Sequence, residues 1–159
     1  MVTSIKGNDT STFGGNIDVP QIITDAPAFS ATSSANQSAS SGVYTKLILD
    51  TKQFDTNSNF DNTTNYRFTP TVAGYYQING TLISPSNATS TVTAIYKNGS
   101  QYVSTVAYHP STGVTQRFNI SILLYLNGST DYVEFYGLQY GGTVLVGGST
   151  MNGSLVRAV

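Results

Sequence analysis

The stretch RFTPTVAGYYQI, residues 67–78, determines how the whole chain is interpreted. It opens with an arginine and then carries no charge, and the charge-free run continues as far as Tyr96. Apolar and polar residues alternate along it, which places Tyr76, Ile78 and Leu82 on one face of a strand. Because burying an uncompensated charge costs several kcal/mol, a strand without charges is typical of one that is covered on both faces. The stretch therefore predicts a central strand of a β-sheet.

The composition of the chain also indicates an all-β protein. Its 159 residues fit one domain with a short arm, and 9% of them are charged, against about 25% in ordinary globular chains. Thr and the 11 Tyr favour strands, whereas Asn and the 15 Gly favour the turns between them. The net charge of -1 disfavours nucleic acid as a partner, and the absence of cysteine excludes disulfides and zinc–thiolate sites. No apolar run approaches the roughly 18 residues of a membrane-spanning helix, so we expect no membrane insertion.

The remaining pattern predicts several short strands and one tight hairpin. Asn98-Gly99 is typical of a type I′ turn between two strands. The segment 54–65 is predicted to be a loop held by Phe54 and Phe60. With about eight to ten short strands and a turn roughly every ten residues, the chain is predicted to be a sandwich or jelly roll. The other expected strands are 43–49, 92–97, 117–126, 143–148 and 154–159.

Four motifs, in order, give the chain a resemblance to a known family. PAFSA (27–31) resembles the first strand of the C1q-like family, and the Gly-x-Tyr-x-Ile of RFTPTVAGYYQI is similar to that family's central motif. IYKNG (95–99) and LYLNGSTDYVEF (124–135) resemble its Asn-Gly hairpin and a late segment. The resemblance covers 27–159 and implies a jelly roll of about ten strands, of the C1q and tumour-necrosis-factor type, assembled as a tight homotrimer. Core and trimer-contact residues on this basis are Phe29, Phe68, Tyr75, Tyr76, Ile78, Phe118 and Ile120.

Residues 1–26 are predicted to be an extended attachment arm. They are polar, contain no recognisable signal peptide, and carry one apolar patch, which could add a strand to the exposed sheet edge of a partner. That patch consists of Ile17, Val19, Ile22 and Ile23. The Asn- and Thr-rich leader GNDTSTFGGNID resembles bacteriophage virion proteins. We therefore expect a trimeric knob on the virion surface, made in the host cytoplasm and bound to capsid or tail proteins.

Two versions of this role remain open from the sequence. The first is a capsid decoration, cement or head-fibre protein, and the second is a tail-fibre tip or receptor-binding module for a host surface glycan or protein. Aromatic rings stack on the apolar faces of sugars, and three tyrosines in predicted loops are the candidates for such recognition. These are Tyr102, Tyr108 and Tyr140.

Catalytic and metal sites have weaker support in the sequence. The single histidine, His109, is predicted to be a solvated loop residue, and no Gly-x-Ser-x-Gly nucleophile motif is present, so we expect no enzyme and no cofactor. Asp50, Asp55 and Asp61 lie close in sequence and could offer oxygens to a calcium ion. Their spacing does not match a calcium-loop motif, so turn formation is the favoured interpretation.

Overall fold

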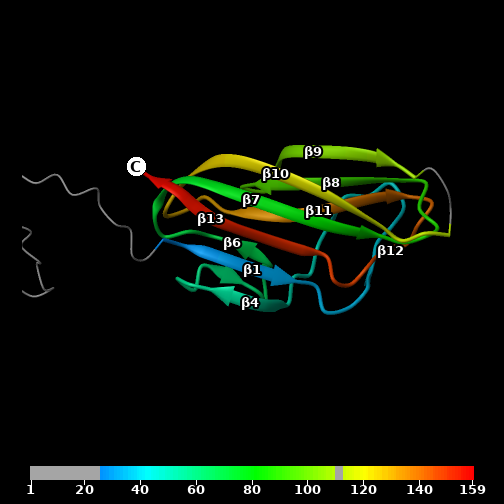
Figure 1. Ribbon diagram of the computed structural model, residues 1–159, viewed down its shortest axis with the longest axis horizontal. Coiled ribbons are helices and arrows are strands. Elements are labelled where there is room, and N and C mark those ends of the chain that lie inside the picture. Colours follow the sequence, from blue (N-terminus) through cyan, green and yellow to red (C-terminus); the bar gives the residue numbers. More distant parts are fainter. Residues whose placement is uncertain (1–25, 110–112) are drawn as a thin grey trace, which may run out of the picture.

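The computed structural model describes residues 26–109 and 113–159, which form two main antiparallel β-sheets packed face to face and a separate two-stranded sheet of residues 37–38 and 144–145 (Figure 1). No helix long and apolar enough to cross a membrane occurs in 26–109 and 113–159. The long strands are β1 (Ala28–Thr32), β4 (Thr51–Asp55), β7 (Ala73–Ser84), β8 (Ser90–Lys97), β9 (Ser100–Tyr108), β10 (Gln116–Asn127), β11 (Val133–Tyr140) and β13 (Thr150–Ala158). Five two-residue strands complete the described set: β2 (Gln37–Ser38), β3 (Thr45–Lys46), β5 (Phe60–Asp61), β6 (Arg67–Phe68) and β12 (Val144–Leu145).

Each sheet is named here after a central strand. The β7 sheet has the order β10-β7-β13-β1-β4, and the β11 sheet has the order β5-β6-β11-β8-β9, with β3 pairing to β11 beside β6. Several neighbours in the sheets are far apart in sequence, as in the pairing of β1 with β13. This arrangement confirms the predicted all-β jelly-roll sandwich.

The strand that the sequence singled out lies inside the β7 sheet. β7 pairs with β10 on one side and with β13 on the other. Tyr76, Ile78 and Leu82 are fully buried on its inner face, as the alternation predicted. A Cβ atom on Gly80 would lie 2.5 Å from the ring of Phe135 on the opposite sheet, so this glycine lets the two sheets approach closely.

The aromatic centre of the core joins both sheets. The ring of Phe29 on β1 stacks on Phe60 and Phe68, with centroid distances of 5.0 and 4.3 Å. Phe68 also contacts the ring of Tyr76 edge-on at 5.6 Å. These residues belong to one buried cluster, so Phe29, Phe68 and Tyr76 are core residues of the protomer.

The predicted hairpin also forms. Lys97 pairs with Ser100, and Asn98 and Gly99 between them both have positive φ, 52° and 76°. A type I′ turn requires this conformation at both central positions, and Asn and Gly are the residues that adopt it most readily.

Several predicted boundaries differ from the structure, and of the expected strand 143–148 only Val144–Leu145 forms. In 43–49 only Thr45–Lys46 pairs as a strand, because β11 accepts β6 and β3 in succession along one edge. The segment 54–65 is not one loop, since β4 ends inside it and β5 forms within it. Phe60 is buried there but Phe54 is 51% exposed, so only one of the two phenylalanines holds the segment. The last strand begins at Thr150, four residues before the predicted start.

Candidate interaction surfaces

The outward face of the β7 sheet is polar and almost uncharged. Its centre is a row of hydrogen-bonded side chains, the polar ladder, formed by Gln77, Asn79, Ser121 and Asn152. Gln77 Nε2 donates to Ser121 Oγ (2.8 Å), Ser121 Oγ donates to Asn79 Oδ1 (2.8 Å), and Asn79 Nδ2 donates to Asn152 Oδ1 (3.0 Å). The charge-free sequence run therefore does not expose a large apolar patch on this face. Neutral groups that satisfy one another occupy it instead.

An apolar group lies on the same face at one end of the sheet. Tyr75 on β7 and Tyr125 on β10 are paired in register and touch edge-on at 5.8 Å, with Tyr75 44% exposed. Leu123 and Val156 are exposed beside them on the adjoining strands. Tyr75 is thus not a core residue of the protomer, because its neighbour Tyr76 takes the inward position. The place of Tyr75 in a subunit contact stays a prediction.

Two other predicted core residues, Phe118 and Ile120, are on the inner face of β10. Ile120 is buried, whereas Phe118 is half-buried and contacts the ring of His109 at 5.2 Å. The edge of the sandwich is less completely covered at Phe118 because β10 is the outermost strand of its sheet.

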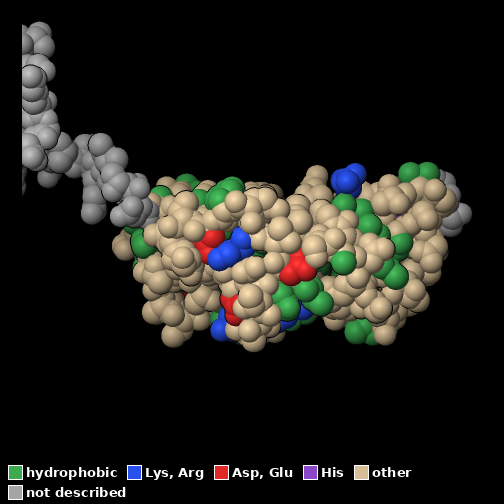
Figure 2. Space-filling view, turned by 90° about the horizontal axis from the view of Figure 1, so that it is seen from below, with side chains coloured by type: hydrophobic (Ala, Val, Ile, Leu, Met, Phe, Trp, Pro, Cys, Tyr) green, Lys and Arg blue, Asp and Glu red, His purple; other side chains and the backbone are tan. Residues whose placement is uncertain are grey.

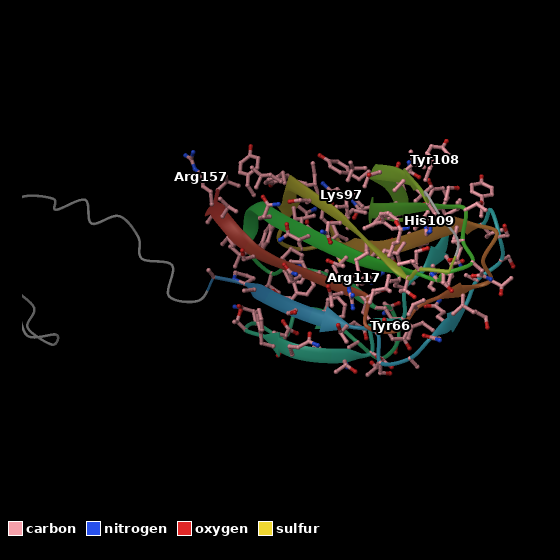
Figure 3. The ribbon with its side chains drawn as sticks, turned by 45° about the vertical axis from the view of Figure 1, so that its right-hand side comes forward. Tyr66, Lys97, Tyr108, His109, Arg117 and Arg157 are labelled. Carbon is pink, nitrogen blue, oxygen red and sulfur yellow. The ribbon has the colours of Figure 1, made fainter. Side chains whose placement is uncertain are left out.

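His109 is not the solvated residue that the sequence predicted. Its Nε2 lies 3.0 Å from Thr91 Oγ1, and Thr91 Oγ1 lies 2.6 Å from Ser84 Oγ, so a buried hydroxyl pair holds the ring. His109 Nδ1 is enclosed and has no hydrogen-bond partner in the described part of the chain. Figure 3 shows His109 beside Tyr108, at the end of the sandwich opposite Arg157. The ring closes that end rather than facing solvent.

The three aspartates weighed as calcium ligands serve separate turns. Asp50 accepts from Ser34, and Asp55 accepts the backbone N–H groups of Asn59 and Phe60. Asp61 accepts three backbone N–H groups from the turn that follows it. Hydrogen bonds from the backbone N–H groups of that turn hold the pKa of Asp61 well below its ordinary value. In 26–109 and 113–159 no three His, Cys, Asp or Glu side chains are grouped as metal ligands, so the turn interpretation fits best.

The outer face of the β11 sheet carries seven of the 11 tyrosines. Strand alternation places every second residue of β8, β9 and β11 on this face, and the segment before β3 adds one more ring. We call this face the tyrosine surface; its members are Tyr44, Tyr96, Tyr102, Tyr108, Tyr132, Tyr136 and Tyr140.

The loop residues chosen from the sequence belong to this surface, but they are not in loops. Tyr102 and Tyr108 lie on β9, and Tyr140 is the last residue of β11. Their exposed fractions are 51%, 79% and 50%. Tyr108 and Tyr140 flank Ser90 in one cross-strand row. These tyrosines are exposed, but the prediction that they lie in loops is wrong, because β9 runs on to Tyr108 and β11 to Tyr140.

A packed cluster at the other end of the tyrosine surface was missed by the sequence reasoning. The rings of Tyr96 and Tyr136 stack at 3.9 Å, and Tyr44 meets Tyr96 edge-on at 5.9 Å. Burial raises the pKa of the Tyr96 hydroxyl and of the Tyr136 hydroxyl. Beside these rings, Lys46 Nζ and Glu134 Oε1 form an ion pair of 3.1 Å. The alternation in DYVEFYGLQY, which places Glu134 and Tyr136 on one face, was the signal that could have found the cluster.

Charged side chains are rare elsewhere on the molecule. Figure 2 shows a face dominated by uncharged polar side chains and backbone, with acidic and basic groups in small isolated patches.

The arm residues Ile17, Val19, Ile22 and Ile23 lie outside the described residues, and the domain boundary near 26 stays a prediction.

Comparison with known proteins places the fold among tumour-necrosis-factor-like structures. No protein-family model and no curated protein matches the chain. Among solved structures, murine APRIL at pH 5.0 is similar with a TM-score of 0.65 and 7% identity, over 82% of this chain and 99% of that one. Eiger TNF from S. frugiperda is similar with a TM-score of 0.63 and 9% identity, over 84% and 93%. PRD1 vertex protein P5 is similar with a TM-score of 0.62 and 16% identity, over 82% and 97%.

These likenesses show that the chain has a TNF-like jelly-roll fold, which it shares with a viral vertex protein as well as with animal proteins. At such identities they show the fold alone. The expected resemblance to C1q and tumour-necrosis-factor proteins is confirmed at the level of the fold.

Proposed function

We propose that the protein is a non-enzymatic structural protein of a virion surface, a homotrimeric knob that its N-terminal arm attaches to a bacteriophage particle. The observation that carries this proposal is the likeness to PRD1 vertex protein P5, which extends over 97% of that chain. The resemblance of the leader to bacteriophage virion proteins supports it from a separate part of the sequence. The proposal places the protein on the virion surface and involves no cofactor.

In the proposed trimer, the outward face of the β7 sheet contributes to the subunit contact. This face has two properties that favour association: its polar groups already satisfy one another, and its apolar end exposes Tyr75 and Tyr125. Burying a satisfied neutral face avoids the desolvation cost that charged groups would add. Arg157 on β13 pairs with Tyr75 on β7 and places a basic group at the rim of this face.

The arm supplies the attachment in this proposal. Four apolar residues within 17–23 can add a strand to an exposed sheet edge of a capsid or tail protein, where backbone hydrogen bonds give affinity. We expect the jelly roll to fold without them, because the described residues already form a large buried core.

Co-sedimentation with particles tests the proposal. The full chain should sediment with virions of its own phage, whereas a chain lacking residues 1–24 should remain soluble, trimeric and unchanged in melting temperature. The double substitution Ile22→Asp and Ile23→Asp keeps the arm length and should have the same effect as the deletion. Full-length protein that fails to bind any particle would overturn the virion role, and a truncated knob that still binds would assign attachment to the jelly roll.

Copy number separates the two versions of the role. Many copies per particle at capsid symmetry positions support a decoration or head-fibre protein, and a few copies at the tail support a receptor-binding tip.

A further inference from the structure

Glu134 differs from every other side-chain carboxylate in the described residues. Asp50, Asp55, Asp61 and Asp131 each accept at least one backbone N–H, and each uses both oxygens in hydrogen bonds. Glu134 accepts a single hydrogen bond, from Lys46 to Oε1, and no backbone N–H. Four carboxylates therefore build turns, and the fifth builds none.

The second oxygen of Glu134 is unpaired although the side chain is only 7% exposed. Its Oε2 has no hydrogen-bond partner among the described residues. This oxygen is still accessible, unlike the three enclosed atoms that lack a partner, which are Thr93 Oγ1, His109 Nδ1 and Gln139 Oε1. The Lys46 side chain is 31% exposed, so the ion pair is buried at Glu134 and open to solvent at Lys46. The pair bridges β3 and β11 among tyrosine rings and leaves the second oxygen of Glu134 uncommitted. A carboxylate oxygen that solvent can reach and that serves no turn can accept a hydrogen bond from a ligand.

Aromatic and cationic residues are the neighbours of Glu134 in the sheet. Tyr96 is paired with Glu134 across β8 and β11 and stacks on Tyr136. On the other side Glu134 is paired with Arg67, whose guanidinium lies over the ring of Tyr132 at 4.2 Å and makes no ion pair with the described residues. The site thus combines one carboxylate acceptor, nearby cationic donors and flat ring faces. The packing of the rings on one another holds these groups in place before a ligand binds.

We propose that Glu134, Arg67 and the rings of Tyr44, Tyr96 and Tyr136 form a binding site for a neutral oligosaccharide. Neighbouring hydroxyls of a sugar ring can donate to the free Glu134 Oε2 and accept from Arg67, while the apolar face of the sugar stacks on a tyrosine. An acidic sugar fits less well, because its carboxylate has no hydrogen to donate to Glu134 Oε2. This proposal does not depend on the virion role, since it concerns a site on the isolated knob.

A printed array of oligosaccharides tests the proposal with purified full-length protein. The array carries neutral hexose and N-acetylhexosamine chains together with sialylated and uronic-acid chains. We expect the protein to bind neutral chains. The substitution Glu134→Gln keeps the shape of the side chain but removes its charge, and it should weaken that binding at least about tenfold, as expected for loss of a hydrogen bond to a charged group.

Two tyrosine substitutions separate the site from general stickiness of exposed rings. Tyr44 contributes one ring of the cluster and lies outside the long strands. Its substitution Tyr44→Ser should weaken binding as Glu134→Gln does. Tyr108→Ser is the matched control, because Tyr108 belongs to the same surface but lies in the row of Tyr140, about 20 Å along β11 from Glu134. It should leave binding unchanged. Melting temperatures within a few degrees of the parent show that each variant is folded.

Three results would overturn the proposal: no neutral chain is bound, only acidic chains are bound, or Tyr108→Ser weakens binding as much as Glu134→Gln does. Because no particle is present in this experiment, failure here leaves the proposed attachment to virions unaffected.

Discussion

Two adjacent tyrosines on β7 allow folding and assembly to be tested separately. Tyr76 is fully buried, its ring contacts Phe68, and its hydroxyl donates to the carbonyl of Val72 at 2.7 Å. Replacing Tyr76 by Asp removes a buried aromatic ring, a loss of about 3–5 kcal/mol, and adds a carboxylate without a partner, at a further cost of several kcal/mol. The sum is comparable with the whole free energy of unfolding of a domain, about 5–15 kcal/mol. We expect Tyr76→Asp to give no folded protein.

The same substitution at Tyr75 should have a different effect. Tyr75 is on the outward face, and within the protomer it loses chiefly its edge contact with Tyr125, worth about 0.5–1.5 kcal/mol. The protomer should therefore fold. In the proposed trimer the new carboxylate would be desolvated once in each subunit, so Tyr75→Asp should be a folded monomer.

Circular dichroism melting combined with light scattering distinguishes these outcomes. A soluble Tyr76→Asp protein with an unchanged melting temperature would show that the inward and outward faces of β7 are reversed. A Tyr75→Asp protein that remains trimeric would place Tyr75 outside the subunit contact.

Two further predictions follow from burial and from charge. Phe29→Ala should destabilise the protein by about 3–5 kcal/mol, whereas Phe54→Ala, its exposed counterpart on β4, should change the free energy of unfolding by less than about 0.5 kcal/mol; similar losses in chemical denaturation would contradict the burial pattern. The pKa values of Asp50, Asp61 and Asp131 are lowered, first by the Ser34 side chain, the Thr64 backbone N–H and the Asn98 side chain respectively. Their stabilisation is therefore complete above the unfolded carboxyl pKa of about 3.9 and is lost as the pH falls through the lower folded values. The melting temperature should fall below about pH 4, and a constant value down to about pH 2 would contradict this.

The fold could be predicted wherever a local pattern had one structural solution. The alternation around Tyr76 and Ile78 and the Asn98-Gly99 turn specify a strand and a hairpin without help from distant residues. Phe54 and Phe60 could not be told apart in this way, because each begins a similar Phe-Asp segment. Only the pairing of β4 with β1 turns Phe54 outward.

The candidate site was less predictable because its groups meet only in the folded chain. Lys46 and Glu134 are 88 residues apart in sequence, and they meet because β6 and β3 pair in succession along one edge of β11. A period of two shows that Glu134 and Tyr136 share a face, but it does not show which strand lies beside them. The ring of His109 was misjudged for the same reason, since Thr91 reaches it from the neighbouring strand.

The mass of the protein in solution tests the central claim, a homotrimeric knob, most directly. Light scattering of the full chain at micromolar concentration should give three times the chain mass of 16.9 kDa, and the chain lacking residues 1–24 should also be trimeric. A stable monomer in this measurement would contradict the trimer and, with it, the proposed use of the β7 sheet as a subunit contact.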